Sequence, residues 1–495
     1  MDFSCFKMYS INLVSLIQWA FVLVVSTVVL IILLSLIAKK YFQKVREKAR
    51  KSGQPFSVAL FHPYCNAGGG GERVLWCAVK AIQARYSSTK IVIYTGDLNA
   101  SPAEIVKKVY TRFNITLSSP VEFIYLHKRK YIEASRYPHF TLLCQSLGSI
   151  SLGCEALFAF LPDVYIDSMG FSFTLPLFKL IGGCTTACYV HYPTISKDML
   201  KRVISRDVTI TNRAHVARSP ILSFAKLVYY RLFAMVYSIC GGYSDSIMVN
   251  SSWTEDQITY IWSGCRDGKN PTHRVYPPCD TKSLQAMPLA KDIGESKEIK
   301  IVSVGQYRPE KDHPLQLKAL YELRQIVSEE TWDRIKLVFI GSCRDSEDHI
   351  RVKDMMDLCK HLSLENNVEF KVNVTYEELK QELASSMIGL HAMWNEHFGI
   401  GVVECMAAGH IMVAHRSGGP KADIIEEAEG SRNGFLAYDE REYAEAIAAI
   451  IKLSPATRKK IREAARSSVD RFSTAEFEKA FLRTIEPLFS CNKVN

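Results

Sequence analysis

The hydrophobic pattern of the chain begins with one long apolar segment. Residues Met8 to Ala38 include no charged side chain and are mostly Leu, Ile, Val and Phe. A helix needs about 20 apolar residues to cross a hydrocarbon core of about 30 Å, whereas a cleavable signal has an apolar region of only about 7–15 residues. The segment therefore predicts one transmembrane helix at the N-terminus.

Beyond Phe56, short β-rich runs alternate with amphipathic helical stretches such as Leu315–Val327 and Tyr376–Ser385. This alternation is typical of α/β domains with parallel sheets. The pattern predicts two such domains, joined by a linker near residues 280–298. The predicted strands are Ser57–His62, Lys90–Tyr94, Val121–Leu126, Val164–Asp167, Ala187–His191 and Ser246–Asn250 in the first domain, and Ile299–Val304, Lys336–Ile340, Val368–Val372, Ile388–Ala392 and Ile411–His415 in the second.

Two further apolar stretches need an interpretation. Pro220–Cys240 is rich in aromatic residues, but Lys226 and Arg231 interrupt it, which argues against a second membrane span. Two interpretations stay open for it: a helix packed in the core, or a helix lying on the membrane surface. The stretch Phe398–Ala414 contains Glu404 and predicts a buried helix followed by a strand.

The charge of the chain is concentrated next to the apolar segment. Of the formal net charge of +10, a block between Lys39 and Lys51 carries +6, from seven basic residues and one glutamate. By the positive-inside rule this block places the following domains in the cytosol. The rest of the chain is too weakly basic for a dedicated nucleic-acid-binding protein. The fourteen cysteines form no CxxC pair, which disfavours a structural zinc site and fits a reducing compartment.

Four consecutive glycines, Gly68 to Gly71, follow the first predicted strand and precede a helical pattern that begins near Glu72. Glycine lets the backbone approach a ligand closely, and a helix N-terminus favours an anion. We therefore expect Gly69 and Gly70 to contact phosphate groups, the alternative being a merely flexible turn. The loop matches neither GxxxxGK[ST] nor GxGxxG, which disfavours nucleotide hydrolysis and dinucleotide redox chemistry.

A second candidate motif follows the strand Ile301–Val304. Gly305 comes first, and Arg308 and Lys311 lie a few residues later. At the carboxyl end of a strand, a guanidinium and an ammonium suit a diphosphate. The chain has no DxD motif, so we predict no metal site and no cofactor, with these two cations neutralising a leaving diphosphate. The alternative is that both cations form surface salt bridges.

The third motif is a pair of glutamates, Glu396 and Glu404, which flank Phe398, Gly399 and Ile400. On one helix the pair would lie about 12 Å apart, more than the roughly 5–9.5 Å of two carboxylates that share a glycosidic bond. The spacing suits a nucleotide sugar, with Glu396 at the hexose hydroxyls and Glu404 at the ribose diol. The alternative is a solvated pair, but Glu404 sits among apolar residues, where a buried carboxylate needs partners.

A candidate histidine, His191, ends the strand Ala187–Val190 within the segment Tyr189-Val190-His191-Tyr192-Pro193. A histidine at a strand end is able to contact a sugar or to stabilise a developing charge. A purely structural histidine is the alternative.

Together, these motifs resemble glycosyltransferase family 4. The resemblance covers roughly residues 56–490 and rests on the glycine loop, on Gly305, Arg308 and Lys311, on the Tyr-His-Tyr-Pro segment and on Glu396-x7-Glu404. It implies a retaining enzyme of GT-B architecture, in which two Rossmann-like domains face a cleft. The sequence is similar in particular to those members of the endoplasmic-reticulum N-glycan pathway that extend dolichyl-diphosphate oligosaccharide with GDP-mannose.

The resemblance also implies an organisation and an activity. Residues 1–55 would be the membrane anchor with its basic segment, 56–285 the acceptor domain, 286–472 the nucleotide-sugar domain, and 473–495 a helix that crosses back to the first domain. The enzyme would add the fourth and fifth mannoses in α-1,2 linkage on the cytosolic face of the endoplasmic reticulum, as a single-pass membrane protein. Its expected partners are GDP-mannose, the dolichyl-diphosphate oligosaccharide, the membrane and other mannosyltransferases of the pathway, with no nucleic acid.

The resemblance assigns roles to residues as well. Glu396, His191, Arg308 and Lys311 would be catalytic. The donor-binding residues would be Gly69, Gly70, Gly305, Arg308, Lys311, Glu396, Phe398, Gly399, Ile400 and Glu404.

Two alternative functions stay open. The first is another membrane-bound family-4 transferase with a different donor or linkage, because spacing does not reveal the base or the sugar. The second is a catalytically inactive, membrane-tethered scaffold that keeps the fold for binding. The joint presence of Glu396, Glu404, Arg308, Lys311 and the glycine loop argues against the scaffold.

Overall fold

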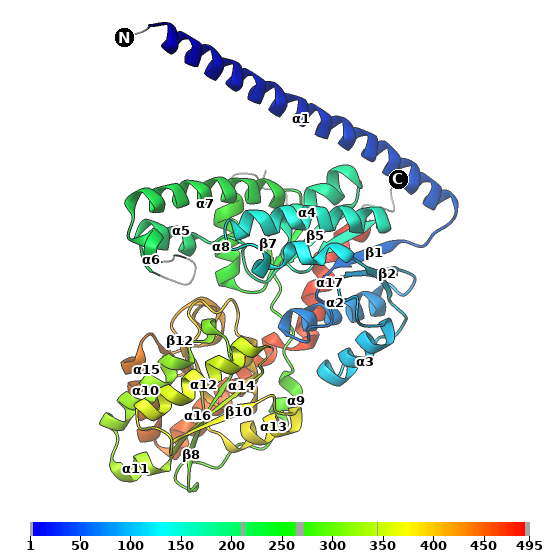
Figure 1. The fold of residues 1–495 in the computed structure, drawn as a ribbon. Helices are drawn as coiled ribbons and strands as arrows, with labels where there is room; N and C mark the ends of the chain where they lie inside the picture. The colour runs from blue at the N-terminus through cyan, green and yellow to red at the C-terminus, as the bar shows by residue number, and fades with distance from the viewer. Residues whose placement is uncertain (1–2, 209–211, 213, 264–271, 344, 491–495) are drawn as a thin grey trace.

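The computed structural model describes residues 3–208, 212, 214–263, 272–343 and 345–490 (Figure 1). Its first element is α1 (Phe3–Lys51), a long helix that extends away from two α/β domains. The part of α1 from Ser15 onward is long and apolar enough to cross a membrane, and its apolar window is not buried in the protein. A second helix, α4 (Thr141–Ala159), meets the same criteria of length and composition but is partly buried.

The first domain contains a seven-stranded parallel sheet with the order β3-β2-β1-β4-β5-β6-β7. Six of its strands were predicted, and the short edge strand β7 was not. The strands are β1 (Ser57–Phe61), β2 (Lys90–Thr95), β3 (Glu122–Tyr125), β4 (Val164–Asp167), β5 (Thr185–Val190), β6 (Ser246–Val249) and β7 (Thr272–Arg274). Besides α4, the helices of this domain are α2 (Gly70–Arg85), α3 (Pro102–Phe113), α5 (Lys197–Ile204), α6 (Ala214–Ala217), α7 (Pro220–Gly241) and α8 (Ser252–Trp262).

Helix α7 confirms that one face of Pro220–Cys240 packs in the core, while the placement on a membrane surface stays a prediction. Tyr230, Phe233 and Tyr237 are buried in the core that covers one face of the first sheet. Other apolar side chains of the same helix face outward, including Ile221 at 79% and Phe224 at 68% exposure. The helix therefore has a core face and an exposed apolar face.

The basic end of α1 packs onto the first domain. Phe42 is only 2% exposed and belongs to the same core as α7. Arg46 pairs with Asp163 at 2.9 Å and also donates to the carbonyl oxygens of Pro162 and Gly182. These contacts fix the direction in which α1 leaves the domain.

The second domain contains a six-stranded parallel sheet with the order β10-β9-β8-β11-β12-β13. Five of its strands were predicted, and β13 was not. The strands are β8 (Ile299–Val304), β9 (Ile335–Gly341), β10 (Val368–Val372), β11 (Ile388–His391), β12 (Ile411–His415) and β13 (Gly434–Ala437). The helices are α9 (Thr281–Gln285), α10 (His313–Ile326), α11 (Glu329–Arg334), α12 (Ser346–His361), α13 (Tyr376–Ser385), α14 (Ile400–Ala408), α15 (Glu440–Lys452) and α16 (Pro455–Ser468).

The chain crosses between the domains twice, and the two crossings lie side by side. Cys279 and Ser473 form an isolated parallel bridge, and the Cys279 N–H donates to the carbonyl of Phe472 at 3.0 Å. The second crossing leads into α17 (Thr474–Ser490), whose Phe477, Phe481 and Ile485 are buried in the core of the first domain. The last helix thus packs on the first domain, as Figure 1 shows.

Candidate active site

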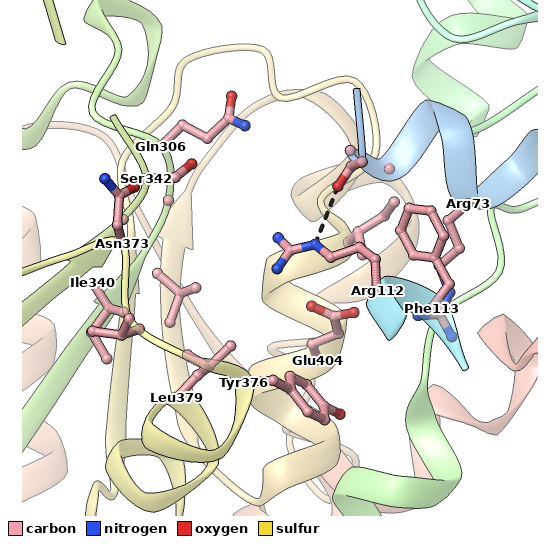
Figure 2. A pocket seen from close by; sticks show the side chains of 18 of the residues that line it. Arg73, Arg112, Phe113, Gln306, Ile340, Ser342, Asn373, Tyr376, Leu379 and Glu404 are labelled. Carbon is pink, nitrogen blue, oxygen red and sulfur yellow. Dashed lines mark hydrogen bonds between the residues drawn. The ribbon is translucent and has the colours of Figure 1, made fainter. Parts of the chain in front are cut away.

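Two neighbouring cavities lie between the two domains at the carboxyl ends of the sheets. The larger has a volume of about 660 Å³ (Figure 2) and the smaller about 390 Å³. Gly69, Gly70, Gly305 and Ile400 line both cavities. In open α/β sheets ligands bind at this edge, so one extended ligand is able to occupy both.

The glycine loop forms part of the wall that the cavities share. An added Cβ at Gly70 would lie 2.7 Å from Ile400 Cδ1 of the other domain, so a larger residue here would have to displace the end of this side chain. Glu72, in the first turn of α2, accepts the N–H of Gly69 through Oε2 at 2.5 Å. This carboxylate therefore holds the loop against the helix N-terminus.

A buried network connects the glycine loop to His191. Glu72 Oε1 lies 3.5 Å from His62 Nε2, and His62 Nδ1 lies 2.9 Å from Ser168 Oγ. The carbonyl of Ser168 in turn accepts a hydrogen bond from His191 Nε2 at 3.0 Å. Burial, together with the nearby charge of His62, lowers the pKa of His191 to about 4, so His191 is neutral at pH 7 and carries its proton on Nε2.

Glu396 lines the smaller cavity and is held by two partners. Its Oε2 accepts a hydrogen bond from Lys311 Nζ at 2.5 Å and contacts His391 Nε2 at 3.0 Å. Burial raises the pKa of Glu396, but the charge of Lys311 and the hydrogen bond from His391 outweigh it and hold the pKa well below the usual range. Glu396 is therefore an anion beside a cation at the centre of the cleft.

The prediction that one helix carries both glutamates is wrong. Helix α14 begins only at Ile400, and Glu396 lies in the loop before it. The backbone has positive φ angles at Asn395 (49°) and Gly399 (111°). A right-handed helix does not continue through such left-handed residues, so the chain turns at both positions before α14 begins. The loop directs Glu396 to the smaller cavity, while Glu404 lines the larger one.

Glu404 lies in the larger cavity beside Arg112 and Tyr376, as Figure 2 shows. Burial raises the pKa of Glu404, and Arg73 and Arg112 oppose this shift without cancelling it. Lys108 and Arg112 also donate to the backbone oxygens of the glycine loop, at 2.6 Å to Asn66 and 3.4 Å to Gly68. The larger cavity thus combines one carboxylate with several cations from the first domain.

Sequence reasoning missed His391, Arg73, Lys108 and Arg112. His391 lies at the carboxyl end of a predicted strand, which is itself a signal for a functional residue. Lys108 and Arg112 are four residues apart, a spacing that places both on one face of a helix. Only the packing of α3 against the glycine loop shows that this face points to the cleft.

The structure brings most of the predicted residues together. Arg308 differs, because its guanidinium lies 3.6 Å from Glu310 on the same turn and lines neither cavity. Glu404 lines the larger cavity. The predicted residues around the smaller cavity are Gly69, Gly70, His191, Gly305, Lys311, Glu396, Phe398, Gly399 and Ile400.

Within the described ranges, no group of three or more His, Cys, Asp or Glu side chains is placed to hold a metal ion. The groups that are able to face a diphosphate are cationic side chains and backbone N–H groups. Lys311 serves the smaller cavity, Arg73 and Arg112 the larger, and the glycine loop serves both.

Comparison with known proteins identifies the family. The family model described as "ALG11 mannosyltransferase N-terminus" matches residues 55–262, and the model "Glycosyl transferases group 1" matches residues 289–468. The GDP-Man:Man(3)GlcNAc(2)-PP-Dol alpha-1,2-mannosyltransferase of Homo sapiens is 51% identical to the chain, over 90% of each protein. The chain belongs to the ALG11 mannosyltransferase family. An ALG11-family relative of the same name from Xenopus laevis is 54% identical over 87% of each protein.

A solved structure supports the architecture. Sucrose-phosphate synthase from Thermosynechococcus elongatus superposes on this ALG11-family chain with a TM-score of 0.62, covering 88% of the chain and 100% of the synthase, at 15% identity. At that identity the likeness concerns the fold alone. The predicted GT-B fold, with two Rossmann-like parallel-sheet domains, is confirmed.

Proposed function

We propose that the chain transfers mannose from GDP-mannose to dolichyl-diphosphate-linked Man3GlcNAc2 in α-1,2 linkage, adding the fourth and fifth mannoses of the N-glycan precursor. The observation that carries this proposal is the 51% identity to the human GDP-Man:Man(3)GlcNAc(2)-PP-Dol alpha-1,2-mannosyltransferase, which extends over 90% of both chains and so includes both walls of the cleft. A relative of the same name from Dictyostelium discoideum is 44% identical over 90% of the chain. A different donor or an inactive scaffold is therefore not favoured.

The donor spans the two cavities in this proposal. Glu404 binds the ribose diol in the larger cavity, and the N–H groups of the glycine loop, with Arg73 and Arg112 nearby, face the diphosphate. The mannose then lies in the smaller cavity beside Glu396. The support is that Glu396 and Glu404 line different cavities and that Gly69, Gly70 and Gly305 lie where the cavities meet.

The transfer itself needs one bond to form and one to break. The acceptor hydroxyl oxygen attacks the anomeric carbon of mannose on the face from which GDP departs, which retains the configuration. The bond from that carbon to the phosphate oxygen breaks, GDP leaves with the electron pair, and the hydroxyl proton passes to the leaving phosphate oxygen. Lys311 and the backbone N–H groups of the glycine loop stabilise the negative charge on GDP, and ionised Glu396 lies near the positive character that develops on the sugar.

The donor site works without a metal ion in this proposal, because cations of the protein carry the charge of the diphosphate. Activity is expected to survive EDTA. A complete loss of activity that Mn²⁺ restores would contradict the assignment of Lys311, Arg73 and Arg112 to the diphosphate.

We further propose that the protein lies on the cytosolic face of the endoplasmic reticulum with α1 as its single span. Helix α7 lies on the side of the first domain that faces α1 (Figure 1), and its exposed apolar side chains include Ile221, Phe224 and Leu232. The rings of Tyr41 in α1 and Phe158 in α4 are in contact, at 6.3 Å between centroids. This face would rest on the bilayer, with other mannosyltransferases of the pathway as further partners.

The deciding experiment uses the full chain in detergent. It is incubated with labelled GDP-mannose and lipid-linked Man3GlcNAc2, and the product is treated with an α-1,2-specific mannosidase. Two added mannoses that this mannosidase removes are the expected result. Transfer from another donor, or a product that resists the mannosidase, would contradict the proposal.

A further inference from the structure

One buried amide oxygen in the smaller cavity has no partner in the protein. Asn250 directly follows β6, lines the smaller cavity and is only 5% exposed. Its Nδ2 donates to the carbonyl of His191 at 2.8 Å. Because a carbonyl only accepts, this bond fixes the orientation of the amide. Oδ1 is left buried and without a hydrogen-bond partner, an arrangement that indicates a ligand that donates a hydrogen bond.

An exposed aromatic residue directly follows His191, whose carbonyl accepts the hydrogen bond from this amide. Tyr192 follows His191 and is 54% exposed. Its ring stacks on His397, with 5.2 Å between centroids and 22° between planes, and His397 lines the smaller cavity. The contact holds the tyrosine ring against a residue that lines the cavity and leaves about half of Tyr192 exposed. A pyranose has a C–H face that packs on such a ring, while its hydroxyls extend from the edge of the sugar.

Both groups belong to the first domain. Tyr192 and Asn250 follow the neighbouring strands β5 and β6. The side chains assigned to the mannose and its leaving group, Glu396 and Lys311, come from the second domain on the opposite wall. A sugar held by Tyr192 and Asn250 therefore approaches the donor mannose from across the cavity, which is the place of the attacking hydroxyl.

We propose that Tyr192 and Asn250 form a binding subsite for the terminal mannose of the acceptor. The sugar ring packs on Tyr192, and one of its hydroxyls donates to Asn250 Oδ1. The inference rests on the proposed function and identifies the residues that recognise the acceptor. Since the product of the first transfer again ends in mannose, the same subsite accepts it for the second transfer.

The first test measures the aromatic contact. Tyr192→Ala is expected to raise the acceptor KM roughly tenfold, while the donor KM and the affinity for GDP stay unchanged. Tyr192→Phe keeps the aromatic ring and is expected to raise the acceptor KM less than Tyr192→Ala does. Tyr260→Ala is the matched control, because Tyr260 is also an exposed tyrosine, at 60% on α8, whereas the rings in contact with His397 are those of Tyr192 and Trp253. An unchanged acceptor KM in Tyr192→Ala would overturn the proposed contact between Tyr192 and the acceptor sugar.

The second test assigns the hydrogen bond by changing both partners. Acceptors are prepared in which one hydroxyl of the terminal mannose at a time, other than the attacking 2-hydroxyl, is replaced by hydrogen. With the wild-type chain, one of them is expected to lose about tenfold in kcat/KM, the value of one uncharged hydrogen bond. Asn250→Ala is expected to lower kcat/KM by a similar factor with the normal acceptor. With that deoxy acceptor, Asn250→Ala is expected to have the same kcat/KM as the wild-type chain.

The possible outcomes distinguish a failure of the acceptor subsite from a failure of the proposed function. If the losses from Asn250→Ala and from every deoxy acceptor simply multiply, Asn250 does not bind the acceptor. If the coupling appears with deoxy GDP-mannose instead, the amide belongs to the donor site and the subsite is wrong. If the wild-type chain has no activity with lipid-linked Man3GlcNAc2, the proposed function itself fails.

Discussion

At the scale of single residues, Glu396 and Glu404 are two buried carboxylates with opposite surroundings. Burial raises the pKa of both, but at Glu396 the ammonium of Lys311 and a hydrogen bond from His391 outweigh it. At Glu404, Arg73 and Arg112 do not offset burial, and the pKa stays raised. Substitutions that remove the carboxylate charge of Glu396 or Glu404 should therefore have different effects on the kinetics.

Glu396→Gln is expected to reduce kcat and kcat/KM together. It keeps the shape of the side chain but removes the negative charge beside the sugar, where positive character develops. Loss of a single electrostatic contact that strengthens in the transition state lowers the rate by roughly 10²–10³. Steady-state kinetics with varied donor measures the effect.

Glu404→Gln is expected to raise the donor KM more than it lowers kcat, because the ribose is remote from the bond that breaks. Calorimetry with GDP provides the control: affinity should fall for Glu404→Gln and stay near wild type for Glu396→Gln. The reverse pattern would show that the donor lies in the opposite direction across the two cavities.

Asp167 predicts a pH dependence of stability. Burial raises its pKa to about 7, despite the N–H groups of Met169 and Gly170 that bond to it. Between about pH 4 and pH 7 the folded state keeps this proton while the unfolded state has lost it, so stability falls as pH rises through this window, by up to roughly 4 kcal/mol. Asp167→Asn should remove this decline. Its melting temperature relative to wild type should be higher at pH 8 than at pH 5, and an equal difference at both values would contradict the assignment.

At the scale of elements, the start of α2 depends on Glu72. Glu72→Ala removes the acceptor of the Gly69 N–H and the partner of His62. The loop that faces the diphosphate then loses its fixed position, and we expect kcat/KM for the donor to fall roughly tenfold, a typical cost of lost positioning at a helix cap. Donor kinetics and melting temperatures are measured together.

The matched control for this variant is Glu104 on α3. Its carboxylate accepts the N–H of Ser101 at 2.7 Å, which is the same capping contact in an exposed place. Glu104→Ala should lower stability slightly and leave the donor kinetics unchanged. A similar kinetic loss in both variants would mean that helix stability, and not the position of the glycine loop, limits the reaction.

At the scale of the whole molecule, we expect two parts of α1 to have different functions: the apolar segment as a membrane tether, and the part with Phe42 and Arg46 as a contact with the first domain. Removal of residues 1–38 deletes the apolar segment but keeps Phe42 and Arg46, so the protein should fold and act on short-lipid acceptors. It should work poorly on membrane-embedded acceptors, because a tether raises the local concentration of enzyme and substrate. A folded but inactive protein with short-lipid acceptors, as judged by circular dichroism and mannose transfer, would contradict a purely tethering role.

Removal of residues 1–51 is the informative comparison. It takes away Phe42, which is 2% exposed in the core, and Arg46, which pairs with Asp163. Loss of a buried phenylalanine alone costs about 3–5 kcal/mol. The melting temperature should therefore drop clearly below that of the shorter truncation, while equal melting temperatures would mean that this end of α1 contributes nothing to the fold.

The sequence by itself determined the features that local pattern encodes. The long apolar segment, eleven of the thirteen strands in the described residues and the glycine loop could be predicted because side-chain periodicity and backbone freedom depend on neighbours along the chain. The two missed strands are β7, with only three residues, and β13, with four. Glu396, Glu404 and Lys311 could be selected as candidate site residues because they lie in short sequence motifs that resemble those of the family.

Only the tertiary structure decided how these groups meet. The loop before α14 separates Glu396 from Glu404, α3 brings Arg112 to the cleft, and Arg308 lies outside both cavities. Asn250 shows its unpaired oxygen only once its amide is fixed by His191. The physical reason is that burial, hydrogen bonding and pKa depend on atoms from distant parts of the chain, and these atoms become neighbours only when the two domains pack around the cleft.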